Sequence, residues 1–168
     1  MIHVCSLARL NDTVKTTGAR HVVTLLGIED RVPLPPGVDA RDYLRLHMHD
    51  ITEPAEGQIT PDLAHVERLV NFVRRWDRAT PLVIHCYAGI SRSTAAAFTT
   101  VCALNTRRDE QDIAMSLRRV SPTAMPNARI VRIADQVLGR DGRMIAAVAA
   151  IGPCVPALQA EPFQLDLE

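Results

Sequence analysis

The chain has 168 residues, of which 47% are hydrophobic and 23% charged, ordinary values for a single soluble globular domain with its own core. Its 19 basic and 19 acidic residues cancel, so no global field points to nucleic acid or an anionic membrane surface as a partner. The first residues show no basic stretch followed by a long apolar run, and we expect no signal peptide. The longest apolar run, residues 144–151, is too short to span a bilayer.

The cysteine pattern indicates the redox environment of the protein. The four cysteines, Cys5, Cys86, Cys102 and Cys154, include no CxxC pair. Their spacing is typical neither of a zinc site nor of a disulfide framework, and it fits a reducing environment. We therefore expect a cytoplasmic protein.

The first part of the chain alternates short apolar segments with loops. Strands are expected at residues 2–5, 21–26 and 43–49, with a short helix or turn at 11–17. The loop after the second of these strands, residues 28–40, is rich in proline.

A longer helix is predicted from Thr60 to about Asp77, after a loop at residues 51–59. Thr60 is the expected N-cap, Pro61 the first helical residue and Asp62 an acid in the first turn. Apolar residues then recur every three or four positions: Leu63, Val66, Leu69, Val70, Val73 and Trp76.

The second part of the chain contains one strand and then only helices. The strand is expected at residues 82–84, and the helices from Arg92 to about Leu104, at 109–120, at 126–139 and at 142–151. This order predicts an α/β fold with a mostly parallel central sheet of four to five strands flanked by helices. We expect one domain over residues 1–152 and an irregular, proline-containing tail over 153–168.

The stretch from Cys86 to Arg92 joins the central strand to the next helix. Amides of such a loop converge at a helix N-terminus and form an anion site. Cys86 lies at the base, where the thiolate form is favoured, and Arg92 can fold back to grip two phosphate oxygens. Gly89 supplies the freedom of φ that the loop needs. This arrangement suits attack on phosphorus and stabilisation of the transition state.

His85-Cys86, five residues and Arg92-Ser93 resemble the signature of the cysteine-dependent protein tyrosine and dual-specificity phosphatases. The chain looks like the compact, bacterial-type members. The resemblance implies the α/β fold of that family, no metal or other cofactor, and a phosphorylated protein or other phosphomonoester as substrate. Unlike the loops of inositide phosphatases, this loop has no Lys or Arg in its interior. Its phosphate-binding residues would be Tyr87, Ala88, Gly89, Ile90, Ser91 and Arg92.

The resemblance also assigns residues outside the loop interior. Asp50, on a loop before Cys86, matches the general acid that protonates the leaving oxygen. Its rivals are Glu53 and Asp62, although Asp62 already has a role at a helix start. Ser93 matches a hydroxyl that assists the thiolate, and it could also cap the helix.

Two further positions match supporting residues. His85 precedes the nucleophile, and strand alternation points it away from Cys86, which favours a buried orienting role over that of a base. Asn127, in Met125-Pro126-Asn127, resembles a Pro-Asn element that braces the phosphate loop, although Asn after Pro is also an ordinary helix opening.

His47 and His49 form an HxH pair on one face of a predicted strand. This spacing occurs in metal sites, but no third ligand stands at a suggestive spacing. A half-exposed strand face is the preferred interpretation, and no metal site is expected.

The sequence thus predicts a metal-independent phosphomonoester hydrolase that forms a cysteinyl phosphate, with phosphotyrosine proteins as the leading substrates and dual specificity open. Phosphothreonine, RNA 5′-phosphates and small metabolites stay as alternative substrates, and the oligomeric state stays open. The alternative function is a phosphate-binding module that recognises phosphorylated partners without turnover. A redox or sulfur-transfer role for Cys86 is a third class, for which no resolving cysteine is identified.

Overall fold

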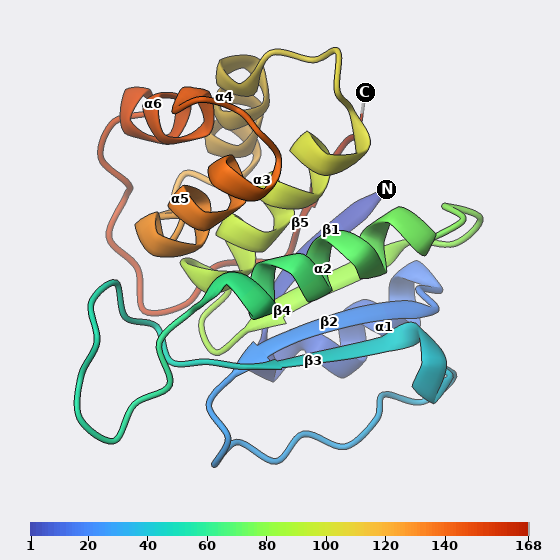
Figure 1. Ribbon diagram of the computed structural model, residues 1–168. Helices are drawn as coiled ribbons and strands as arrows, with labels where there is room; N and C mark the ends of the chain where they lie inside the picture. Colours follow the sequence, from blue (N-terminus) through green and yellow to red (C-terminus); the bar gives the residue numbers. More distant parts are fainter. Residues whose placement is uncertain (168) are drawn as a thin grey trace.

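Five strands form one sheet in the order β3-β2-β4-β1-β5 in the computed structural model, which describes residues 1–167 (Figure 1). β4 pairs in parallel with β1 and β2, β2 pairs in parallel with β3, and β5 runs antiparallel to β1. The mostly parallel sheet of four to five strands is therefore confirmed. The strands are β1 (Ile2–Ser6), β2 (His21–Leu26), β3 (Tyr43–His47), β4 (Leu82–Cys86) and β5 (Phe163–Leu165).

Helices cover both faces of this sheet. α1 packs on one face, and the other helices gather on the opposite face (Figure 1). None of the helices in the described part of the chain is long and apolar enough to cross a membrane. The helices are α1 (Leu10–Thr17), α2 (Leu63–Arg75), α3 (Arg92–Leu104), α4 (Glu110–Val120), α5 (Ala128–Val137) and α6 (Arg143–Ala150), with short 3-10 turns at Leu7–Arg9 and Ala40–Asp42.

The strand that precedes the phosphate loop is the most enclosed. All five residues of β4 are buried, because the strand has a neighbour on either side and helices above and below. Alternation sends Ile84 and Cys86 to the larger core and Val83 to the core under α1. Cys86 therefore ends a strand that is fixed on every side.

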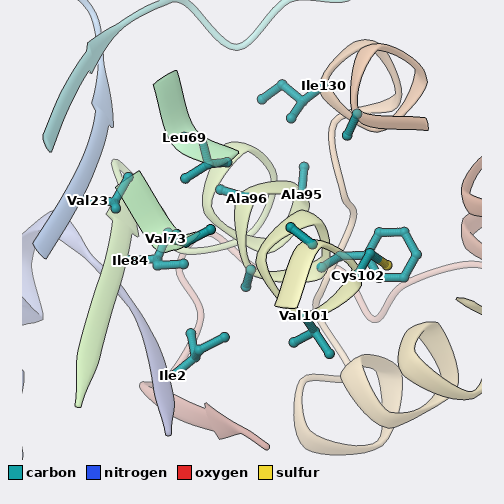
Figure 2. Packing of buried hydrophobic residues seen from close by; sticks show 14 of the residues in the cluster. Ile2, Val23, Leu69, Val73, Ile84, Ala95, Ala96, Val101, Cys102 and Ile130 are labelled. Atoms are coloured by element: carbon teal, nitrogen blue, oxygen red, sulfur yellow. The ribbon is translucent and has the colours of Figure 1, made fainter. Parts of the chain in front are cut away.

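α3 runs through the centre of the larger core. Every residue from Arg92 to Ala103 is buried. Small side chains at Ala95 and Ala96 let this helix pack between α2 and α5, next to Leu69 and Ile130 (Figure 2). The N-terminus of α3 is thereby held in place beneath the loop that precedes it.

α2 begins later than predicted. Leu63 is its first residue, and Asp62 rather than Thr60 is the N-cap. The Asp62 carboxylate accepts a hydrogen bond from the His65 amide (3.0 Å), and His65 Nδ1 accepts one from the Asp62 amide (3.2 Å). This capping box gives the amides of Asp62 and His65 their hydrogen-bond partners and so sets the start of α2.

The C-terminal segment is partly regular. Residues 163–165 were expected to be irregular but form β5, with Phe163 opposite Val4 and Leu165 opposite Ile2. Leu165 is buried, so the pairing is stabilised by the apolar side chain that it places against the core. The division of the chain into a domain at 1–152 and a separate tail stays a prediction.

Candidate active site

The loop of residues 87–91 lies at the C-terminal edge of the sheet, between Cys86 at the end of β4 and Arg92 at the start of α3. We call it the phosphate loop. The Cys86 side chain is buried at its base, and the first turn of α3 brings the Ser93 hydroxyl to 3.1 Å from the Cys86 sulfur. Ser93 is itself fully buried, so its hydroxyl can donate a hydrogen bond to a thiolate in a site with little competing water.

Residues outside the phosphate loop donate hydrogen bonds to its carbonyl groups. The Tyr87 carbonyl accepts a hydrogen bond from the Leu7 amide (3.1 Å). The Ile90 carbonyl accepts one from the Met125 amide (2.9 Å).

In a trans peptide, the carbonyl and the following amide point in opposite directions. The amides that follow these two carbonyls therefore point into the loop. Within the described residues, no group accepts a hydrogen bond from the amides of residues 87–91. The loop is a ring of free donors, suited to an anion.

Gly89 adopts a φ of 76°, the left-handed conformation that favours glycine. A Cβ at this position would lie 2.9 Å from the carbonyl carbon of Cys5 and 3.0 Å from the Ser6 nitrogen. The phosphate loop thus rests directly on the backbone at the end of β1, and only glycine allows that approach.

Arg92 is buried beside the loop. Its Nη1 donates to the Met48 carbonyl (2.8 Å), which anchors the guanidinium just before Asp50. Its Nε makes no hydrogen bond within the described residues and lies 3.9 Å from Oδ2 of Asp50. A buried donor without an acceptor is costly, and an oxyanion in the loop would satisfy it.

Asp50 lies at the mouth of the phosphate loop. Its Oδ1 accepts hydrogen bonds from the Ser91 hydroxyl (2.7 Å) and from Nδ2 of Asn127 (2.8 Å). The structure thus places Asp50 against Ser91 of the phosphate loop and beside Arg92, while its role as the general acid stays a prediction. The rival acid Asp62 is instead engaged at the start of α2.

Asn127 contacts both parts of the site. Its backbone amide donates to the Ser91 carbonyl (3.3 Å), and its side-chain amide reaches Asp50. Its Oδ1 accepts from the amides of Arg129 and Ile130 and so caps α5. Asn127 thus contacts the phosphate loop through its backbone, and its expected bracing role stays a prediction. The sequence did not suggest its link to Asp50.

His49 closes the loop that carries Asp50. The His49 amide donates to the Ile59 carbonyl (2.8 Å), and the Ile59 amide donates to Nδ1 of the same histidine (2.8 Å). Nε2 lies 3.2 Å from the Glu29 carboxylate. Because Nδ1 accepts, the neutral ring carries its proton on Nε2 and donates it to Glu29.

The two histidines of the HxH pair, His47 and His49, lie in different surroundings. Nδ1 of His47 is buried without a partner among the described residues, whereas His49 is bonded as above. Those residues contain no cluster of three His, Cys, Asp or Glu side chains that could hold a metal ion. Sequence reasoning took His49 as a strand-face residue and missed its bonds, because β3 ends at His47 rather than at His49.

His85 is fully buried, and its Nε2 lies 2.7 Å from the Thr24 hydroxyl. Thr24 in turn donates to the Tyr43 hydroxyl (3.0 Å), so it accepts from His85. Burial, assisted by the charges of Arg45 and Arg92, lowers the pKa of His85 to about 4. The imidazole is therefore neutral at physiological pH and oriented across the sheet toward β2.

A depression of about 580 Å³ adjoins the mouth of the phosphate loop. It shares Asp50 and Ser91 with the loop and is bounded by Glu53 and Met125. Glu53, the other rival acid, thus lines this depression rather than the base of the loop. Met125, which lines the depression, is exposed, and so is Tyr87, the first residue of the phosphate loop.

Comparisons with known proteins identify the family of this fold. A model of the family described as protein-tyrosine phosphatase matches residues 38–126. The chain belongs to the protein-tyrosine phosphatase family and is a phosphatase. A search of curated proteins finds no match.

Solved structures share the fold at low sequence identity. DUSP15 is 20% identical, with 89% of each chain covered and a TM-score of 0.65. Human DUSP28 is 18% identical, with 83% of this chain and 92% of that chain covered and a TM-score of 0.62. PTPMT1 in complex with PI(5)P is 15% identical, with 89% of this chain and 93% of that chain covered and a TM-score of 0.63.

Proposed function

We propose that the chain hydrolyses phosphomonoesters through a cysteinyl phosphate on Cys86, with phosphotyrosine proteins as its substrates. The observation that carries this proposal is the position of the Asp50 carboxylate. It is hydrogen-bonded to Ser91 of the phosphate loop, while Cys86 lies at the base of the same loop. A nucleophile and an acid are therefore present at opposite ends of one anion site.

In the first step, the Cys86 thiolate attacks phosphorus, a sulfur–phosphorus bond forms and the bond from phosphorus to the substrate oxygen breaks. Arg92 and the loop amides stabilise the charge on the equatorial oxygens. Asp50 enters as the carboxylic acid and gives its proton to the leaving oxygen.

In the second step, Asp50 is a carboxylate and takes a proton from water. The water oxygen attacks phosphorus, and the sulfur–phosphorus bond breaks. Inorganic phosphate and the Cys86 thiolate are released. Ser93 supports this step because its hydroxyl, 3.1 Å from the sulfur, can donate to the departing thiolate.

Features of the rim support an aryl phosphate on a protein. Tyr87 and Met125 are 65% and 57% exposed and offer apolar contact to an aromatic ring. The loop interior contains no Lys or Arg, so its positive charge comes from Arg92 and suits one phosphate group. Because Arg92 and the amides supply the stabilisation, the proposed reaction requires no metal.

The test combines two variants with p-nitrophenyl phosphate and a phosphotyrosine peptide. We expect Cys86→Ser to abolish turnover while vanadate still binds. Asp50→Asn should lower kcat on the peptide by about 10²-fold, and by less on p-nitrophenyl phosphate, whose leaving group needs no proton. Addition of EDTA should leave the rate unchanged. Turnover by Cys86→Ser would contradict the nucleophile, and equal kcat for Asp50→Asn on the peptide would contradict the acid.

The same assay decides between turnover and binding alone. A binding module would show vanadate and phosphopeptide affinity without hydrolysis by the wild-type protein. Such a module requires the loop and Arg92 only, so the additional presence of Asp50 and Ser93 supports turnover. A phosphothreonine peptide in parallel measures dual specificity as a ratio of kcat/KM values.

A further inference from the structure

The C-terminal segment, residues 153–165, touches the phosphate loop. The amide of Ala160 donates a hydrogen bond to the Ala88 carbonyl over 2.9 Å. Ala160 is 2% exposed although the residues before it, including Leu158 at 99%, face solvent. From this contact we infer that Ala160 is a positioning residue for the phosphate site, which acts by fixing the peptide between Ala88 and Gly89.

The argument depends on the planarity of that peptide. Its carbonyl, from Ala88, points toward Ala160, so its amide, from Gly89, points the opposite way, into the ring of free donors. Rotation of the unit would reverse both groups. A carbonyl oxygen would then face the bound anion in place of a donor, which exchanges attraction for repulsion.

This peptide is the one in the loop that can rotate most easily. Reversal of a peptide changes ψ of the residue before it and φ of the residue after it, as in the exchange between type I and type II turns. Glycine accepts either sign of φ at little cost, and Gly89 stands directly after the peptide. The Ala160 amide therefore fixes the orientation of the Ala88–Gly89 peptide, which the local sequence does not fix.

Among the described residues, the hydrogen bond to the Ala88 carbonyl comes from Ala160. The neighbouring carbonyls of Tyr87 and Ile90 are held by Leu7 and Met125, both within the first 152 residues. On the opposite side, Gly89 rests on the backbone of β1, which fixes its Cα but not the direction of the preceding carbonyl.

The segment is anchored on both sides of Ala160. Before it, the Val155 amide donates to the Pro122 carbonyl over 2.9 Å. After it, Phe163 and Leu165 pair with β1. Ala160 is therefore held against the loop by two attachments, and the contact is part of the fold.

The test removes the Ala160 N–H and leaves its side chain in place. Lactate, the α-hydroxy acid analogue of alanine, is incorporated at position 160, so that an ester replaces the amide. The matched control carries the hydroxy-acid analogue of leucine at position 158, because the Leu158 amide donates no hydrogen bond among the described residues. Ala160→Pro, which also lacks the backbone N–H, is the variant that can be made by expression. If it does not fold, the comparison of the two esters tests the inference.

The measurements are kcat/KM for p-nitrophenyl phosphate, the inhibition constant of orthovanadate and the melting temperature. Circular dichroism gives the folded fraction by which the rates are normalised. We expect the ester at 160 to lower kcat/KM for p-nitrophenyl phosphate about tenfold and to raise the inhibition constant of orthovanadate about tenfold, the loss expected for one misdirected donor. The ester at 160 should melt a few degrees below the control, because it loses one buried hydrogen bond. A merely structural role would lower the melting temperature without a change in the vanadate constant.

The inference rests on the proposed function, and the outcomes separate the two. If the wild-type protein turns over substrate and the two esters have equal vanadate constants, the role of Ala160 is overturned and the phosphatase reaction stands. If the wild-type protein neither hydrolyses p-nitrophenyl phosphate nor binds vanadate, both proposals are overturned.

Discussion

Asn127 donates a hydrogen bond from Nδ2 to Oδ1 of Asp50 over 2.8 Å, so the residue that caps α5 also holds the proposed general acid. The bond fixes Oδ1, and Oδ2, which faces Arg92 Nε at 3.9 Å, is the oxygen that would carry the proton for the leaving group. Orientation of the acid thereby depends on a helix that does not belong to the phosphate loop.

Replacement of Asn127 by Ser should separate the two roles of this residue. Serine can still cap α5 but has no donor that reaches Asp50. We expect about a tenfold fall in kcat on a phosphotyrosine peptide with little change in melting temperature. Asn127→Ala, which also removes the cap, should in addition cost about 1 kcal/mol of stability in urea unfolding. An unchanged kcat for Asn127→Ser would show that the bond to Asp50 has no part in catalysis.

Replacement of His49 should loosen the loop that carries Asp50. His49→Ala leaves the Ile59 amide without its acceptor and removes the contact with Glu29. We expect faster proteolytic cleavage within residues 51–58 and a kcat lowered about tenfold. His49→Asn, which keeps a donor and an acceptor, is the control and should recover part of both. Equal cleavage rates for His49→Ala and the wild type would contradict this account.

Gly89 and Gly57 form a matched pair for substitution. Both have positive φ, 76° and 72°, but a Cβ at Gly57 would meet no atom within 4 Å, whereas one at Gly89 would collide with the backbone of β1. Gly57→Ala should cost about 1–2 kcal/mol, the cost of the left-handed conformation. Gly89→Ala should cost more and should also abolish vanadate binding. Similar losses in the two variants would show that the close approach to β1 is unimportant.

His85 should make stability depend on pH in the acid range. Its pKa is about 4 in the folded protein and 6.5 when solvated, so the unfolded chain binds the proton first as pH falls. The contribution is fully present above pH 6.5 and is lost as pH falls toward 4, by a total of about 3 kcal/mol. Urea unfolding across this range should show a smaller slope of free energy against pH for His85→Gln. Identical slopes would exclude His85 as the source.

The phosphate loop could be predicted from sequence because its parts are adjacent in the chain. Cys86, Gly89, Arg92 and Ser93 lie within one strand-loop-helix unit, so local patterns place them together. Asp50 required the family resemblance, since nothing local distinguishes it from other acids on loops. The roles of these residues stay predictions until the variants are measured.

Contacts that depend on distant parts of the chain could not be predicted. β5 is only three residues long and follows Pro162, and its pairing with β1 joins segments from opposite ends of the sequence. Ala160 has no side-chain chemistry, and its contact is made by the backbone. His49 acquires partners only when the loop to Ile59 closes. Each of these features arises from tertiary packing rather than from local periodicity.

The central place of β4 in the sheet has a kinetic consequence. Its amides, paired on both sides and buried, should be among the slowest to exchange with deuterium, so the strand that carries the nucleophile opens only on global unfolding. Asp50, in contrast, stands on a loop whose own attachments are a few hydrogen bonds. On warming, hydrolysis of phosphotyrosine, which needs a donated proton, should decline at lower temperature than hydrolysis of p-nitrophenyl phosphate. The enzyme would then lose activity on substrates whose leaving group needs a proton at a lower temperature than that at which it unfolds.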